Sequence, residues 1–251
     1  MPFQLAACAE MLWLDRPMAW RCARLREMGF AVGLWNWPDH DIDALVATGA
    51  EFTIMNGFLA GDLYDRPEVM LHSARETIKV GKRLGVARYC LLGAALPEGP
   101  KPALTDAQRL CARDTLARFC DLGAAEGVSF ALENLNVLVD HAGAPLASFE
   151  EVFDLVSGLD HPNLRINLDL YHVQIGAGNL IETCRRALPW IGEIQVADVP
   201  GRNDIGTGEI NFLNVALALD QMGYQGMITF EGRPIGTAEA ALQAFRSAFT
   251  L

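Results

Sequence analysis

Four oxygen-bearing side chains follow apolar runs in the second half of the chain, each near the point where its run ends. They are Glu133 in ALEN, Asp169 in NLDL, Gln195 in EIQVAD and Glu231 in TFEG. Carboxylates gathered in a low-dielectric place repel one another, and a divalent cation removes that conflict. Carboxylate and amide oxygens suit Mg²⁺ or Mn²⁺ better than zinc. The pattern predicts that these residues hold one divalent metal ion, Mg²⁺ or Mn²⁺.

A site of this composition suits proton transfer beside a carbonyl group. Moving a carbonyl between adjacent carbons requires that a proton leave one carbon and return to its neighbour. The developing enediolate oxygens need positive charge nearby during this transfer. A metal ion supplies that charge and a pair of carboxylates can carry the proton, so the residue types favour an isomerase.

The elements that must position these residues alternate along the chain. Apolar, β-prone runs occur at 3–10, 30–37, 51–57, 87–93, 129–134, 164–170, 191–198 and 227–232. Helical spacing lies between them, as at 69–84 and 110–122. Helix C-termini are expected at Gly29, Gly49, Gly85, Gly127 and Gly223. The alternation predicts a closed (β/α)₈ barrel with its active site at the C-terminal ends of the strands. An open doubly wound sheet is the alternative, but neither GxGxxG nor GxxxxGK[ST] occurs where nucleotide binding would need it.

Length and composition favour one domain over residues 1–251, because 51% hydrophobic content can bury a large core. The Pro/Gly segment LPEGPKP (96–102) is read as one loop without a domain boundary.

The formal charge of −11 disfavours nucleic acid and anionic membranes, so we expect a small-molecule partner. No apolar run approaches a membrane span and no basic leader precedes one, which indicates a cytoplasmic protein. The six cysteines form no CxxC pair and are read as buried, reduced thiols.

Longer motifs in the C-terminal half carry a family resemblance that extends over most of the chain. ALENLN, NLDLYHVQ, IGEIQVADVPGR and GTGEIN resemble the hydroxypyruvate isomerase-like branch of the xylose isomerase-like TIM barrels. That family also contains ketose 3-epimerases and, more remotely, endonuclease IV. The resemblance implies that Glu133, Asp169, Gln195 and Glu231 hold one metal ion. It also implies that Glu133 and Glu231 form the acid/base pair.

The resemblance extends to residues around the predicted metal site. His172 and Arg202 match positions that contact substrate oxygens, and Asn56 with Gly61-Asp62 matches a loop that flanks the site. Glu209 lies in a family motif without an assigned role.

Each of these matches has an alternative. His172 could be a satisfied wall histidine. Arg202 could bind a substrate carboxylate through its guanidinium fork, or it could pair with Asp198 or Asp204 in its own loop. The other histidines, His40, His72, His141 and His161, fall in loops or helices and receive no role.

The chain departs from the family on one side of the expected mouth. Gly33 stands where many members carry Glu, and Met55 stands where His is common. The mouth is therefore expected to be more apolar there. Trp35 and Trp37 could stack on a sugar, or they could close the core or make contacts in a homo-oligomer, and Trp13 has the same alternatives.

The functional hypotheses follow from these residues. The leading one is a metal-dependent aldose–ketose type isomerase acting on a short hydroxy-carbonyl compound. A ketose 3-epimerase would use the same metal and glutamates with a larger pocket. A catalytically silent barrel that binds a partner would be indicated by a lost ligand, and all four are present. A nuclease role is disfavoured, because its multi-zinc site needs further histidine ligands and because the negative net charge opposes DNA binding.

Overall fold

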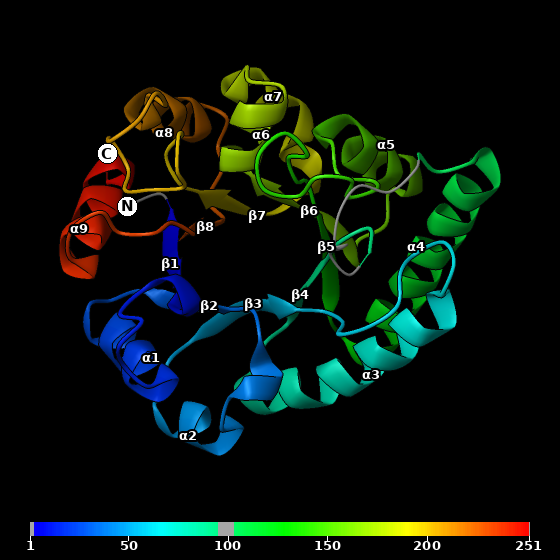
Figure 1. The fold of residues 1–251 in the computed structure, drawn as a ribbon, viewed down its shortest axis with the longest axis horizontal. Coiled ribbons are helices and arrows are strands. Elements are labelled where there is room, and N and C mark those ends of the chain that lie inside the picture. Colours follow the sequence, from blue (N-terminus) through cyan, green and yellow to red (C-terminus); the bar gives the residue numbers. More distant parts are fainter. Residues whose placement is uncertain (1–2, 95–102, 251) are drawn as a thin grey trace.

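The computed structural model describes residues 3–94 and 103–250. In these ranges parallel strands close into a barrel in the order β1 to β8, with β8 pairing back to β1 (Figure 1). The strands are β1 Gln4–Cys8, β2 Ala31–Leu34, β3 Phe52–Asn56, β4 Arg88–Leu91, β5 Ser129–Glu133, β6 Leu164–Asp169, β7 Ile191–Val196 and β8 Met227–Phe230. Each strand lies inside one predicted run, so the (β/α)₈ barrel is confirmed. The loop predicted at 96–102 lies outside the described residues.

Helices surround the strands on the outside of the barrel (Figure 1). They are α1 Met18–Glu27, α2 Ile42–Ala47, α3 Pro67–Leu84, α4 Asp106–Glu126, α5 Phe149–Leu159, α6 Leu170–Gly176, α7 Leu180–Ala187, α8 Phe212–Gln221 and α9 Ala238–Phe249. Short 3₁₀ helices occur at η1 Ala9–Met11, η2 Trp37–Asp39 and η3 Leu188–Trp190. Capping boxes begin α4 at Thr105 and α5 at Ser148. The glycines expected after helices all have positive φ, as C-terminal turns require.

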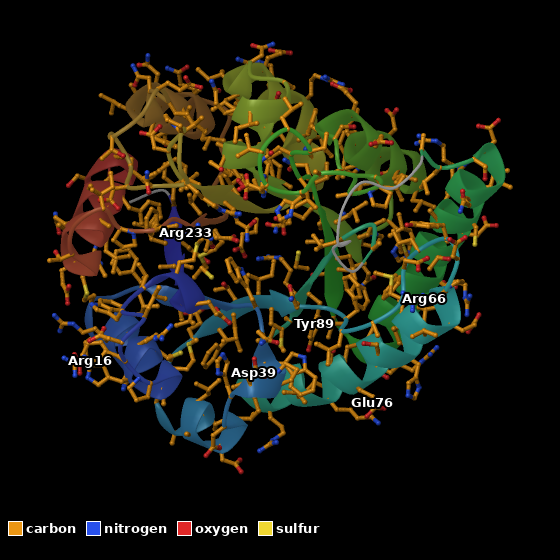
Figure 2. The ribbon with its side chains drawn as sticks, in the orientation of Figure 1. Arg16, Asp39, Arg66, Glu76, Tyr89 and Arg233 are labelled. Atoms are coloured by element: carbon orange, nitrogen blue, oxygen red, sulfur yellow. The ribbon has the colours of Figure 1, made fainter. Side chains whose placement is uncertain are left out.

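The core lies between the helices and the barrel. Phe119 of α4 packs edge-on against Phe130 of β5, with ring centroids 4.8 Å apart. Tyr89 is fully buried and donates from its hydroxyl toward main-chain carbonyls of Ile78 and Val86. Figure 2 shows Tyr89 on the inner side of α3, whereas Glu76 of the same helix points outward. Among the described residues, no helix combines the length and apolarity needed to cross a membrane.

The barrel interior is partly polar. Glu193 of β7 is fully buried, accepts a bond from Thr229 of β8, and pairs with Arg88 of β4 at 3.0 Å. Side chains two residues apart on a strand share a face, so Gln195 projects from the same side of β7 one level nearer the C-terminal end. The Glu193–Arg88 ion pair thus lies one layer below Gln195, on the side away from the C-terminal mouth.

Candidate active site

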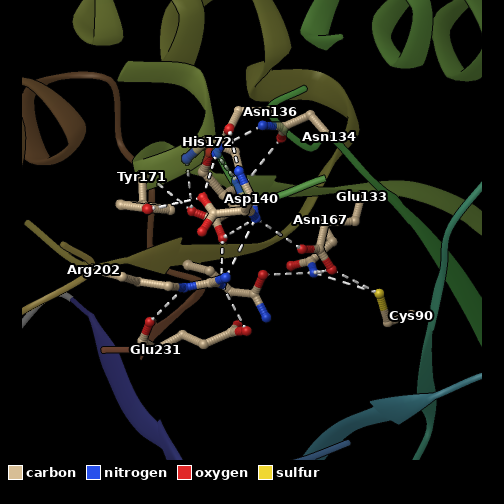
Figure 3. A network of polar contacts seen from close by, with 12 residues as sticks. Cys90, Glu133, Asn134, Asn136, Asp140, Asn167, Tyr171, His172, Arg202 and Glu231 are labelled. Carbon is tan, nitrogen blue, oxygen red and sulfur yellow. Dashed lines mark hydrogen bonds and ion pairs between the residues drawn. The ribbon is translucent and has the colours of Figure 1, made fainter. Parts of the chain in front are cut away.

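The predicted ligand residues converge at the C-terminal ends of β5 to β8. Glu133 and Asp169 end β5 and β6, Gln195 lies one residue before the end of β7, and Glu231 follows β8. All of these side chains are buried, and none is more than 8% exposed. The β6–β7 register places Asp169 level with Gln195. Figure 3 shows the resulting polar cluster, with Glu133 and Glu231 on different sides of it.

Polar side chains of β4 and β6 hold two of the predicted ligands from below. Asn167 Nδ2 donates to Glu133 Oε2 at 2.9 Å and to Gln195 Oε1 at 2.8 Å. Cys90 Sγ donates to the same Glu133 oxygen at 2.9 Å. Sequence reasoning missed Asn167, although its place two residues before Asp169 puts both side chains on one face of β6. These bonds fix one oxygen of Glu133 and leave Oε1 toward the mouth, 3.9 Å from His172 Nε2.

Arg202 lies among the carboxylates. Its Nη2 donates to Asp169 Oδ2 at 2.9 Å and to Glu231 Oε1 at 2.8 Å, and its Nε donates to the Glu231 carbonyl oxygen at 3.0 Å (Figure 3). Its ion pairs are therefore with Asp169 and Glu231 and not with Asp198 or Asp204, the partners considered from the sequence. The Arg202 side chain is 12% exposed, so these interactions are only weakly screened by water.

A loop organised by Asp198 presents this arginine. The Asp198 carboxylate is fully buried and accepts main-chain N–H bonds from Val199 and Ile210 at Oδ1 and from Gly206 and Gly208 at Oδ2. Gly208 is required there, because a Cβ atom would lie 2.0 Å from the Val199 carbonyl oxygen.

Main-chain bonds in both directions between Asp198 and Asn203 close the turn that contains Arg202. Arg202 itself has φ 58°, and its carbonyl accepts from the Arg233 N–H at 2.7 Å. The left-handed conformation turns the side chain back over the barrel mouth.

Hydrogen bonds also settle the tautomer of His172. Asn136 Oδ1 accepts from the main-chain N–H groups of Val139 and Asp140, which fixes the orientation of its amide. The amide nitrogen then donates to His172 Nδ1 at 2.7 Å. Burial first, and the charge of Arg202 second, lower the pKa of His172 to about 2, so the ring is neutral. A neutral ring that accepts at Nδ1 carries its proton on Nε2, which lies 3.4 Å from Asp169 Oδ2.

The carboxyl groups of the site are harder to ionise than usual. Burial, followed by the charge of Asp169, raises the pKa of Glu133 to about 7. Burial also raises the pKa of Glu231 and that of Asp169, although Arg202 opposes both shifts. Glu231 Oε2 is buried without a hydrogen-bond partner. A cluster with one guanidinium for three carboxylates is short of positive charge.

A cavity of about 330 Å³ opens above this cluster. Its lining includes Glu133, Gln195, Arg202, Glu231 and the predicted Asn56. Asp169 and His172 do not line it, since Arg202 bonds to the first and lies 3.5 Å from the second.

One histidine without an assigned role and one of the two tryptophans near the mouth line the cavity. His141, which received no role, lines the cavity, with its ring centroid 5.2 Å from that of His172. Trp35 also lines the cavity, held by bonds from its main-chain N–H and that of Asn36 to Glu10 Oε1 at 2.6 and 3.0 Å.

Other candidates lie elsewhere. Trp37 is absent from the cavity lining, and Trp13 packs edge-on against Trp20. Asp62 accepts main-chain N–H bonds from residues 64–66 before α3 and lines a separate hollow. Glu209 is exposed and accepts a bond from Gln174.

The geometry defines a barrel with a buried acidic cluster, in which polar atoms of Glu133, Asp169 and His172 lie within 4.8 Å of one another. A family model described as "Xylose isomerase-like TIM barrel" matches residues 26–248. The chain belongs to the xylose isomerase-like TIM barrel family.

Relatives match it almost from end to end. It is 28% identical over 253 residues to the 2-oxo-tetronate isomerase of Pectobacterium atrosepticum, covering 95% of each chain. It is 26% identical over 257 residues to the hydroxypyruvate isomerase of Escherichia coli, covering 96% of this chain and 97% of that one. These relatives confirm the prediction of an isomerase.

Solved structures share the fold. An AP endonuclease, family 2, from Brucella melitensis superposes with a TM-score of 0.85 at 22% identity, covering 99% of both chains. D-psicose 3-epimerase from Clostridium cellulolyticum superposes with a TM-score of 0.81 at 17% identity, covering 99% of this chain and 100% of that one. At these identities the likeness concerns the barrel alone.

Proposed function

We propose that the chain interconverts a short hydroxy-aldehyde and hydroxy-ketone by moving a proton through an enediolate, with Glu133 and Glu231 as the acid/base pair. The observation that carries the proposal is that these two buried glutamates, at the ends of β5 and β8, line one cavity. The pKa of Glu133, raised to about 7, suits a group that both accepts and returns a proton near neutral pH.

The residues fit a divalent metal ion. Three carboxylates face one guanidinium, and the buried Glu231 Oε2 has no partner, so a further cation has both a charge to balance and an oxygen to bind. Glu133, Asp169, Gln195 and Glu231 would hold it, with Mg²⁺ or Mn²⁺ preferred by such oxygens. When bound, the ion supplies positive charge beside the developing enediolate oxygens.

His172 is better suited to donate a hydrogen bond than to bind metal. Its Nε2 carries the proton in the tautomer that Asn136 imposes, so it has no lone pair to offer an ion. The guanidinium of Arg202 and, on the opposite wall, the amide of Asn56 line the cavity and could donate to substrate oxygens, whereas the His172 N–H lies behind Arg202 and outside the cavity lining. Arg202 would release Asp169 or Glu231 as it bonds to substrate.

The size of the cavity suits a small hydroxy-carbonyl substrate. Its volume of about 330 Å³ is at the lower end of the range for small-molecule pockets. A silent binding barrel has no need of acid/base glutamates with a raised pKa in the same pocket.

The test replaces each glutamate with its isosteric amide. Glu133→Gln and Glu231→Gln keep one oxygen for the ion but cannot carry a proton, so exchange of the substrate proton next to the carbonyl with D₂O should fall by about 10²-fold or more. Exchange is followed by mass spectrometry at saturating Mg²⁺, so that lost metal does not imitate lost chemistry. Glu209→Gln, exposed and outside the cavity, is the control. Undiminished exchange in both cavity variants would refute the proposed chemistry.

A further inference from the structure

The loop that follows β5 directs one imidazole into the cavity. Val137, Leu138 and Val139 are 46%, 72% and 68% exposed. His141, two residues further on, is half-buried and lines the cavity. Hydrophobic burial alone would give the opposite arrangement, with the apolar side chains inside and the imidazole in water. Polar contacts must therefore set the path of this loop.

Hydrogen bonds centred on Asn136 hold that path. Its side-chain oxygen accepts from the main-chain N–H groups of Val139 and Asp140. Its main-chain carbonyl accepts from the His141 N–H at 3.1 Å, and the His141 carbonyl accepts from the Ala144 N–H at 2.9 Å. The imidazole is thus carried by a turn whose backbone is already fixed on both sides of it.

The ring of His141 has hydrogen-bonding capacity that the described residues do not use. It makes a tilted contact with the ring of His172, with centroids 5.2 Å apart, and no described group forms a hydrogen bond with either of its nitrogens. Burial lowers the pKa of His141, with Asp140 opposing the shift and Arg202 adding to it. A neutral imidazole offers one N–H donor and one acceptor, so this ring can bind an oxygen-bearing group in the cavity.

Arg202 has unused donors beside the same neighbouring ring. Its Nη2 and Nε bond to Asp169 and Glu231, whereas its Nη1 lies 3.5 Å from His172 Nε2. Because His172 Nε2 carries the ring proton, this contact joins two donors and forms no hydrogen bond. No other described group accepts a hydrogen bond from Nη1. An oxygen in the cavity would supply the acceptor that Nη1 lacks.

His141 and Arg202 cover one buried ring. Both line the cavity and both contact His172, which does not line it. We infer that His141 and Arg202 Nη1 together bind one oxygen of the substrate, so that His141 is the histidine that contacts substrate. The inference rests on the proposed function and adds a substrate-binding residue to it. His172, the histidine expected in that role from the sequence, lies behind the two side chains.

Exchange kinetics with the Mg²⁺-saturated protein test this contact. Glycolaldehyde, D-erythrulose and hydroxypyruvate are first screened by mass spectrometry for exchange with D₂O that depends on Glu133, and the fastest probe is kept. His141→Phe keeps a ring without nitrogens, so KM should rise about tenfold while kcat stays within about twofold of wild type. His141→Gln restores a donor and an acceptor and should return KM to within about threefold. His72→Phe, exposed on α3, is the control and should match wild type.

The outcomes separate the inference from the function on which it rests. Circular dichroism verifies that each variant folds. A folded His141→Phe variant with an unchanged KM would overturn the inference and leave the proposed function standing, whether or not kcat falls. Absence of Glu133-dependent exchange with every probe would overturn both.

A double-mutant cycle tests whether the two side chains bind the same oxygen. Arg202→Met removes the guanidinium, and His141→Phe is then measured in that background. Groups that share one oxygen should be coupled, so the tenfold effect of His141→Phe on KM should shrink to about threefold or less. An undiminished effect would show that the two groups act on separate oxygens and would overturn the shared contact.

Discussion

Replacing Asp198 with asparagine removes the centre of the loop that presents Arg202. The aspartate accepts main-chain bonds from Val199 and Ile210 on one oxygen and from Gly206 and Gly208 on the other. Asparagine keeps the shape but has one acceptor oxygen. Whichever way its amide turns, two N–H donors face an NH₂ group and lose a charge-assisted bond.

The size of the effect follows from those two bonds. Hydrogen bonds to a charged group contribute about 1.5–3 kcal/mol each, so the loss lies between about 3 and 6 kcal/mol. The lower end is expected, because Gly206 and Gly208 are exposed and their freed N–H groups can reach water. About 3 kcal/mol corresponds to a fall in melting temperature of about 6–12 °C in a chain of this length.

Urea unfolding followed by circular dichroism measures the change. Asp204→Asn is the matched control in the same loop, because Asp204 accepts one long bond, 3.3 Å from the Ile235 N–H. The control should lose about 1 kcal/mol or less. At saturating Mg²⁺, Asp198→Asn should also exchange substrate protons more slowly, since Arg202 is no longer held over the mouth. Equal unfolding free energies for the two variants would show that the Asp198 carboxylate does not organise the loop.

Two further changes test the cluster and the core. Arg202→Met should tighten Mn²⁺ binding by about tenfold, because the substitution frees Asp169 and Glu231 from a competing cation. Calorimetry measures the affinity, and unchanged or weaker binding would contradict that competition. Cys111 is half-buried and the other cysteine thiols are buried. A thiol reagent should therefore label one cysteine per native chain and none in Cys111→Ser. Rapid labelling of two or more cysteines would contradict this burial of the thiols.

The strands and the convergence of the ligands were predictable because they follow from periodicity. Barrel strands are buried on both faces, so they occur as apolar runs, and the barrel rule places the residues that end them at one mouth. Glu133, Asp169, Gln195 and Glu231 lie there as expected. Their roles as ligands and acid/base groups remain predictions.

The loop residues were not predictable in this way. His141 lies eight residues after β5, and the path that returns it to the cavity depends on the amide of Asn136 rather than on any repeat. From the sequence, Arg202 was expected either to bind a substrate carboxylate or to pair with Asp198 or Asp204, whereas its ion pairs are with Asp169 and Glu231. Asp198 is instead saturated by main-chain N–H groups, and the left-handed turn at Arg202 directs its side chain toward Asp169.

The pairing of β1 with β8 closes the barrel and places Glu231 at its mouth. Gln4 pairs with Met227 and Ala7 with Phe230, and Glu231 follows directly on the β8 side. During synthesis β1 therefore stays unpaired on this edge until β8, the last strand of the barrel, has been made, and its backbone edge is open to other chains. A ribosome-bound barrel can neither close nor gain its final carboxylate until residue 231 has emerged. Truncated products would consequently be both inert and prone to associate through β1, which makes them recognisable to chaperones and proteases.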